Sequence, residues 1–489
     1  MRKSGILMHI TSLPGRYGIG TLGKSAYEFV DFLKAAGQSY WQILPLSPTG
    51  YGDSPYQAYS TFAGNAYLID PDILIGQGLL TRQEADSFSW GSGDRVDYGK
   101  LYEQRENLLY LAFRRFEPDG DYRAFLEENE WWLKEYALFA ALKRKFGGKP
   151  WTDWTSSLMF RLDDALEESR RELAEQIRFR YFLQYQFRCQ WQALKRYANE
   201  QGIQIIGDVP IYVPLDSADV WAAPELFRLD KSRRPELVAG CPPDSFSQDG
   251  QLWGNPLYDW DKMKKDGYGW WVRRLRAALE LYDAVRLDHF RGFESYWAIP
   301  AQETTAQNGA WLPGPGMDLI RTLQEAFPGR AFIAEDLGYV TEEVRQLQLD
   351  SGYPGMKVLE FAFDSRESGD YLPHRYPVDS VCYTGTHDNV TLKQWFDEAA
   401  PQDVEAAKTY LGLNEEEGFV WGMIRGAMSS VSRLCIVQMQ DYLELGAQAR
   451  MNHPGTLSVK NWTWRAQPGF ATEDLAQKIR EITCRYDRI

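Results

Sequence analysis

Four acidic side chains stand at or just beyond the ends of short apolar segments of the sequence. Asp208, Asp288 and Glu335 each close such a segment, and Asp388 comes shortly after another, in the run THDN. A single aspartate in this position can instead cap the following helix, but four acids in equivalent places favour a shared function. Two carboxyl groups about 5 Å apart are what retaining glycoside chemistry needs, one as nucleophile and one as general acid/base.

Basic and imidazole side chains flank two of these acids. Arg286 precedes Asp288 by two residues, so both point to the same face of a strand, and the positive charge favours an ionised, nucleophilic carboxylate. Two of the five histidines, His289 and His387, adjoin acids, which favours a functional role for both. A metal site built from these histidines and carboxylates is the alternative, although their spacing offers no compact ligand set.

The acids must be positioned by the elements that precede them. Eight apolar or β-branched segments alternate with helical stretches, a pattern typical of βα units in a parallel sheet. Eight such units predict a (β/α)8 TIM barrel, in which catalytic groups lie at the C-terminal ends of the strands. The predicted strand segments are 5–13, 40–46, 203–213, 284–288, 331–335, 357–363, 380–386 and 434–440.

A barrel of this kind takes about 250 residues, so a chain of 489 must carry large insertions. We expect residues 1–48 and 203–489 to form the catalytic barrel. Residues 49–202, between the second and third strands, are expected to form a mainly helical insertion. The range 241–258, rich in Pro, Gly, Asp and Asn, predicts a long ordered loop at the active site.

The last part of the insertion has a clear helical period. Phe179, Leu183, Phe187, Trp191 and Leu194 recur every three or four residues. Such a stripe could be a binding surface, but it is far more often the buried face of a helix. We therefore predict that these five side chains pack in the core.

Composition narrows the class of ligand and the cellular compartment. The chain has 54 Lys and Arg against 68 Asp and Glu, a net charge of −14, which argues against nucleic acids and anionic membranes as partners. A neutral ligand is expected. Five dispersed cysteines predict reduced thiols, and no apolar run reaches the length of a signal-peptide core or a membrane span. We expect a cytoplasmic protein.

A glycine motif near the N-terminus matches a nucleotide-binding pattern. Gly18, Gly20 and Gly23 match the GxGxxG fingerprint of dinucleotide sites, between a predicted strand and a predicted helix. That fingerprint also needs an acidic residue about 20 residues further on, at the end of the second strand, and here no acid occurs before Asp53. The glycines are better explained by a tight turn between strand and helix.

The chain also contains, in this order, the segments ITSLPGRYGIGTLG, GYGDSPYQ, GDVPIYV, CPPDSFSQDGQLWGNPLYDW, VRLDHFRGF, AEDLG, THDN and RMNHPGTLSVKNWTWR. Together they resemble the 4-α-glucanotransferases (amylomaltases or disproportionating enzymes) of glycoside hydrolase family 77 in the α-amylase clan. The resemblance runs from about residue 5 to residue 465. It implies a barrel without a C-terminal β-sandwich, and the 49 residues after Gln440 agree, since a sandwich takes about 100. We expect neither a cofactor nor a bound metal ion.

Carried over position by position, the resemblance makes Asp288 the nucleophile, Glu335 the general acid/base and Asp388 the third carboxylate, which holds sugar hydroxyls at the −1 subsite. Tyr56 would stack on the −1 sugar, and Trp253 would shape the acceptor side. The full set of residues assigned to substrate binding is Arg286, His289, His387, Asp208, Tyr56, Trp253, Asn255, Asp364 and Asn452.

The resemblance favours an enzyme that cleaves an α-1,4-glucan and transfers the released segment to the 4-hydroxyl of an acceptor glucan or glucose. Its partners would be the donor and acceptor sugars. A glucan hydrolase with the same carboxylates is the first alternative, since only the group that intercepts the intermediate differs. A non-catalytic glucan-binding protein is the second, but binding alone needs no ionised pair of acids.

Overall fold

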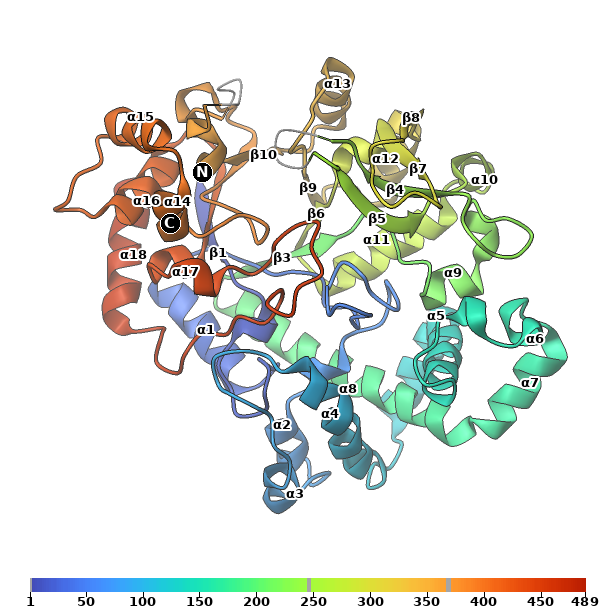
Figure 1. Cartoon of the computed structure of the whole chain (residues 1–489). Coiled ribbons are helices and arrows are strands. Elements are labelled where there is room, and N and C mark those ends of the chain that lie inside the picture. Colours follow the sequence, from blue (N-terminus) through green and yellow to red (C-terminus); the bar gives the residue numbers. More distant parts are fainter. Residues whose placement is uncertain (1, 244–247, 366–370) are drawn as a thin grey trace.

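The core of the molecule is a closed barrel of eight parallel strands (Figure 1). The computed structural model describes residues 2–243, 248–365 and 371–489. Barrel strands that follow one another in the chain lie side by side, and the last closes on the first through paired residues such as Leu7 and Gln438. The barrel strands are β1 (Lys3–Leu7), β2 (Tyr40–Gln42), β3 (Gln204–Val209), β6 (Ala284–Leu287), β9 (Ala331–Ala334), β10 (Gly355–Val358), β11 (Ser380–Tyr383) and β12 (Leu434–Gln438).

Each of the eight predicted segments supplies one barrel strand, so the predicted TIM barrel is confirmed. Several strands end earlier than the apolar segments do. The segment 203–213 leaves the sheet at Val209, and Leu359–Phe363, which follows β10, is a short 3-10 helix (η6). The residues beyond these strand ends are the ones that build the mouth of the barrel.

Helices surround the barrel, and neighbours in this layer pack in the order α18, α1, α8, α11, α12 and α13. The helices are α1 (Lys24–Ala35), α2 (Pro71–Gly76), α3 (Arg82–Asp86), α4 (Tyr98–Phe113), α5 (Gly120–Lys145), α6 (Ser156–Met159), α7 (Asp163–Glu172), α8 (Ala174–Glu200), α9 (Ala218–Ala222), α10 (Trp260–Lys265), α11 (Gly269–Leu281), α12 (Gly316–Ala326), α13 (Glu342–Ser351), α14 (Leu392–Glu398), α15 (Pro401–Leu411), α16 (Phe419–Ser429), α17 (Met439–Tyr442) and α18 (Glu473–Arg485).

Residues 49–202 contain α2 to α8, and Figure 1 shows α2 to α7 gathered below and to the right of the barrel, away from α14 to α18. The last helix, α8, also packs on β3, α1 and α11, so it belongs to the barrel's own helix layer. Its predicted core face is confirmed, because all five side chains of the stripe are buried, with Phe179, Trp191 and Leu194 fully enclosed.

A second sheet stands beside the mouth of the barrel, and the sequence patterns did not predict it. Its four strands are antiparallel and lie in the order β5, β4, β7, β8. They are β4 (Leu237–Cys241), β5 (Gln251–Pro256), β7 (Ser295–Pro300) and β8 (Ala310–Pro313). The range 241–258 is therefore not simply a loop: β5 occupies 251–256, while residues 244–247 lie outside the described part of the chain.

The glycine motif near the N-terminus forms a tight turn. A Cβ atom at Gly20 would collide with the carbonyl of Ile10, and one at Gly23 would collide with the carboxylate of Asp70. Asp70 accepts hydrogen bonds from the Thr21 hydroxyl and from the backbone N–H groups at the start of α2. A carboxylate thus lies beside the N-terminus of α1, where a pyrophosphate would have to bind, which supports the turn interpretation.

After β12 the described residues form α17, a 3-10 turn and α18, with no strand of a further sheet. The C-terminus returns to the barrel, where the Arg488 guanidinium donates to the carbonyl of Lys3 over 3.0 Å. Within the described residues, no helix combines the length and the apolar character that crossing a membrane would require.

Candidate active site

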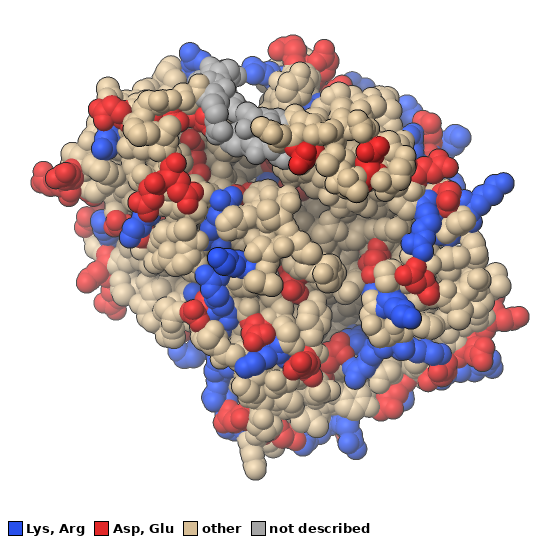
Figure 2. Space-filling model, viewed as in Figure 1, with Lys and Arg blue, Asp and Glu red and all other residues tan. Residues whose placement is uncertain are grey.

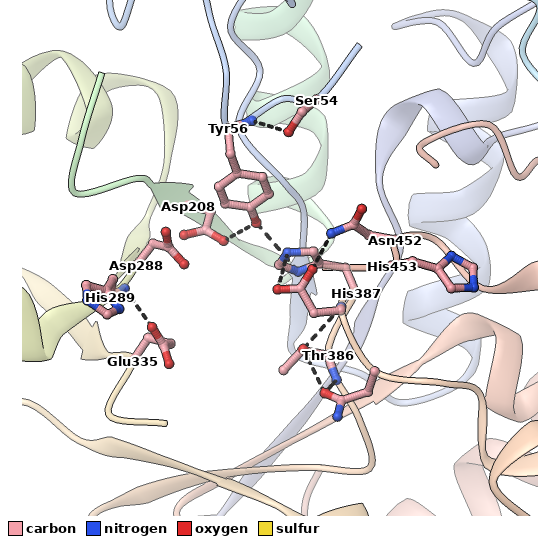
Figure 3. Close-up of polar contacts among 12 residues, drawn as sticks. Ser54, Tyr56, Asp208, Asp288, His289, Glu335, Thr386, His387, Asn452 and His453 are labelled. Carbon is pink, nitrogen blue, oxygen red and sulfur yellow. Dashed lines mark hydrogen bonds and ion pairs between the residues drawn. The ribbon is translucent and has the colours of Figure 1, made fainter. Parts of the chain in front are cut away.

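Asp208, Asp288 and Glu335 lie together at one mouth of the barrel, as their places in the sequence predicted (Figure 3). Asp388 lies at the same mouth, where it contacts His387 and Asn452. Asp208 lies within β3, Asp288 directly follows β6, Glu335 directly follows β9, and Asp388 lies in the turn after β11. Two of these side chains remain open to solvent, with 26% of Asp288 and 43% of Asp388 exposed. Asp288 and Asp388 are thus accessible to a ligand. Figure 2 shows that this face of the molecule is hollowed near its centre.

A buried arginine joins two of the acids. Asp208 and Arg286 are directly paired in the register of β3 and β6, so both side chains point into the barrel side by side. The Arg286 Nη1 atom lies 2.6 Å from Asp208 Oδ2 and 3.0 Å from Asp288 Oδ1. The Tyr56 hydroxyl donates to the same Asp208 oxygen over 2.7 Å. Asp208 is itself fully buried, so it positions Arg286 and Tyr56 and makes no contact with solvent.

Glu335 is held by the backbone. Its two carboxyl oxygens accept hydrogen bonds from the N–H groups of His289 and Leu337, over 2.6 Å and 3.0 Å. His289 has a left-handed backbone conformation, with φ 51°, which is uncommon for a residue other than glycine. This strained turn aims the His289 N–H at Glu335, as strained residues near functional sites often do.

Burial and charge give Asp288 and Glu335 different acidities. Burial raises the pKa of both carboxyl groups above the ordinary range. Arg286 lowers the pKa of Asp288 by its charge and by a direct hydrogen bond, whereas it reaches Glu335 by charge alone. The negative charge of Asp288 raises the pKa of Glu335 further. Asp288 therefore loses its proton before Glu335, which leaves one carboxylate beside one carboxylic acid.

The opposite side of the mouth carries His387, Asp388 and Asn452. Tyr56 stacks on the His387 ring with a centroid distance of 5.0 Å, and His387 Nε2 lies 3.4 Å from Asp388 Oδ2. The amide of Asn452 donates to Asp388 Oδ1 over 2.6 Å. Burial lowers the pKa of His387, which keeps this ring neutral, and Asp388 opposes that shift.

Trp253 and Asn255 come from β5, so the second sheet supplies one wall of the site. The Trp253 ring meets the His289 ring edge to face at 4.8 Å, and burial lowers the pKa of His289 to about 3. Asn255 is buried and accepts a hydrogen bond from the amide of Gln57 over 3.2 Å. Thus Trp253 is placed beside the residue that follows Asp288.

Asp364 differs from the other predicted site residues in its position. It ends the 3-10 helix η6 after β10 and is partly exposed, but it is not part of the hydrogen-bonded set described above. In the described ranges, no three His, Cys, Asp or Glu side chains are grouped so as to hold a metal ion.

Comparisons with known proteins identify the family of the chain. A family model described as 4-alpha-glucanotransferase, of glycoside hydrolase family 77, matches residues 8–472. The chain belongs to this family. Similar proteins include the 4-alpha-glucanotransferase of Clostridium butyricum, 48% identical over 98% of this chain and all of the relative. That of Thermus thermophilus is 48% identical over all of this chain and 99% of its own.

Solved structures give the same result. The amylomaltase of Streptococcus agalactiae in complex with acarbose is 42% identical, covers both chains completely and superimposes with a TM-score of 0.97. The amylomaltase of Corynebacterium glutamicum is only 18% identical and covers 75% of its own chain, with a TM-score of 0.77, so it supports the fold alone.

Two further residues of the site in this member of the 4-α-glucanotransferase family were not predicted from the sequence. Arg450 donates to the backbone carbonyl of Asp388 over 2.8 Å and to that of Asn452 over 2.7 Å. The Trp462 ring contacts the rings of both Tyr56 and His387. Both lie in the segment RMNHPGTLSVKNWTWR, in which the family resemblance assigns a role to Asn452 alone. Their proximity to Asn452 in that segment was the available signal.

Arg286 should set the acidic limb of the pH profile of this glucanotransferase. We expect Arg286→Gln to move the rising limb of kcat/KM to higher pH by about 1–3 units, because Asp288 loses the charge that lowers its pKa. The measurement is the pH dependence of kcat/KM with maltotriose as the only substrate. Arg286→Lys keeps the charge and serves as the control, with a smaller shift. An acidic limb that stays in place in Arg286→Gln would contradict this role.

Proposed function

We propose that this glucanotransferase-family enzyme cleaves an α-1,4-glucan and transfers the released glucosyl segment to the 4-hydroxyl of another glucan or of glucose. The observation that carries the proposal is the pairing of Asp288, held by Arg286, with Glu335, held by two backbone N–H groups. One ionised and one protonated carboxyl group at the same mouth suit a retaining double displacement. The donor and acceptor sugars are the proposed partners.

In the first step, the Asp288 carboxylate attacks the anomeric carbon and the glycosidic bond to O4 of the leaving sugar breaks. Glu335 gives its proton to that oxygen, and a covalent glucosyl–enzyme ester remains. In the second step, Glu335 takes the proton of the acceptor 4-hydroxyl, whose oxygen displaces Asp288 from the anomeric carbon. Both carboxyl groups then return to their starting states.

The −1 subsite would be completed by residues that hold the donor sugar. Asp388, exposed and fixed by Asn452, suits hydrogen bonds to two sugar hydroxyls. Tyr56 offers a partly exposed ring for stacking, and His387 supports that ring from its other face. Asp208 and Arg286 act through Tyr56 and Asp288 and so position the groups that touch the sugar.

The cysteines bear on where the enzyme works. Cys189, Cys382, Cys435 and Cys484 carry free thiols, and Cys382 and Cys435 are fully buried. Reduced thiols suit a reducing compartment, so we also propose that the chain acts in the cytoplasm.

The direct test is incubation of the pure enzyme with maltotriose. Transfer gives glucose together with a ladder of longer oligosaccharides, because the released segment is passed to another sugar. Hydrolysis alone gives only glucose and maltose, since water then intercepts the intermediate. Separation of the products by chain length distinguishes the two, and the second result would exclude transferase activity.

The role of Glu335 can be tested by changing the leaving group. Glu335→Gln should lose about 10²–10⁴-fold in activity on maltotriose, because the leaving oxygen then receives no proton. With a maltosyl fluoride donor, whose leaving group needs no proton, formation of the intermediate should largely survive. Asp288→Asn is the control and should be inactive with both donors. An equal loss on both donors in Glu335→Gln would rule out the acid role.

The role of Trp253 can be tested by the fate of the intermediate. Transfer requires that a sugar hydroxyl outcompete water, so an acceptor must be positioned and water partly excluded. Trp253→Ala should therefore raise the ratio of hydrolysis to transfer while donor cleavage continues. Free reducing ends are measured against transfer products. An unchanged ratio with a lower melting temperature would mean that Trp253 only anchors β5.

A further inference from the structure

A cavity of about 420 Å3 opens on the flank of the molecule, where α5, α8 and α11 meet. We name it the flank cavity. Five of its lining side chains are aromatic: Phe62, Phe125, Trp131, Trp132 and Phe187. Trp131 is 48% exposed, which is unusual for so large an apolar ring. The volume lies within the range of about 300–1,000 Å3 that is typical of small-molecule sites.

The aromatic wall is preformed. The Phe62 and Trp131 rings meet edge to face, with 4.8 Å between their centroids, and the centroids of the Trp132 and Phe62 rings are 6.4 Å apart. The indole N–H of Trp132 donates to the side chain of Asn129 over 2.9 Å, and the Asn129 amide donates to the carbonyl of Phe125. The hydrogen bond holds Trp132, and Trp131 packs edge to face on Phe62, so a ligand would bind with little loss of freedom at these rings.

The segment that carries Phe62 is anchored to the barrel layer. The Thr61 N–H donates to Asp219 over 2.9 Å, and Arg274 donates to the Thr61 hydroxyl over 2.8 Å. At Gly64 both backbone groups are bonded to the Gln184 side chain. A Cβ atom at Gly64 would collide with the Phe187 ring, so the close approach of this segment to α8 requires glycine.

Polar groups stand around this aromatic wall. Arg273 and Arg276, three residues apart on α11, are exposed, and within the described part of the chain no carboxylate lies at ion-pair distance from either. Arg188 and Glu280 already neutralise each other at 3.1 Å, and Glu128 adds an acceptor. The lining thus offers hydrogen-bond donors and acceptors beside flat apolar faces, with charges of both signs.

We propose that the flank cavity is a second binding site for α-1,4-glucan, separate from the catalytic mouth. A pyranose ring presents an apolar face of C–H groups, which suits the aromatic rings, and a rim of hydroxyls, which suits the arginine and glutamate side chains. The negative charge of the Glu128 carboxylate would repel a phosphorylated ligand. A neutral sugar can instead donate and accept hydrogen bonds there. This proposal rests on the proposed function for the choice of glucan as the ligand.

The same segment links the cavity to the catalytic site. Phe62 follows Tyr56 by six residues, a length of chain that spans at most about 22 Å. A glucan bound in the flank cavity would thus be kept near the catalytic mouth, which raises the local concentration of its free ends. Long glucans would gain from this, whereas maltotriose is too short to use both sites.

The first experiment counts binding sites. In the Asp288→Asn background, in which the glucan is not consumed, maltoheptaose binding is measured by titration calorimetry. Adding Trp131→Ala should remove one site or weaken it about tenfold, the factor for losing one ring contact. Phe160→Ala, which removes a 39% exposed ring outside the cavity, is the matched control and should change nothing. The same number and strength of sites in both variants would overturn the proposal.

The second experiment separates this proposal from the proposed function. In the otherwise unmodified enzyme, Trp131→Ala and Arg276→Ala should leave kcat/KM for maltotriose unchanged and raise KM for long amylose several-fold. If the wild-type enzyme makes no ladder from maltotriose, the proposed function fails, whatever the calorimetry shows. If maltotriose is disproportionated but amylose kinetics do not change in either variant, only the second site is overturned. Binding of adenosine monophosphate instead of maltoheptaose, lost in Arg276→Ala, would also overturn it.

Discussion

The catalytic mouth depends on one buried ion pair, between Asp208 on β3 and Arg286 on β6. The two residues are paired in the strand register, so the pair exists only if these strands align correctly. Removing two charges from water is costly, and loss of either partner would cost about 3–5 kcal/mol by leaving the other charge unpaired. The pair also positions two residues of the site, because Arg286 contacts Asp288 and Asp208 accepts a hydrogen bond from the Tyr56 hydroxyl. The barrel's register is thereby tied to the placement of the reacting groups.

The barrel and its acids could be predicted from the sequence because the signals are local. A strand buried on both faces is a short apolar run, and its carboxyl end is marked by the first polar residues after it. Parallel strands end at the same side of a barrel, so the sequence predicts that Asp208, Asp288 and Glu335 lie close together. The positions of Asp388 and His387 at the same mouth could be predicted in the same way, although β11 ends several residues before them.

The features that could not be predicted from the sequence depend on contacts between distant parts of the chain. The sequence predicts a loop where β5 lies, because the residues QLWGNP have little strand pattern, and only pairing with β4 makes them a strand. Apart from its nearness to Asn452, nothing in the sequence predicts the contact of Arg450 with the backbone carbonyl of Asp388, 62 residues away. The flank cavity likewise arises from three helices whose individual patterns predict only burial.

The hold on Glu335 has a consequence for how mutational data on this enzyme should be interpreted. Its carboxyl group is positioned by main-chain donors, one of them from a residue with left-handed backbone. A substitution at His289 can therefore impair catalysis without any contribution from the imidazole, simply by relaxing the turn. Asn and Gly tolerate this conformation better than Ala does. An alanine scan at this position would report backbone geometry and ring chemistry together, whereas a comparison of Asn, Gly and Ala would separate them.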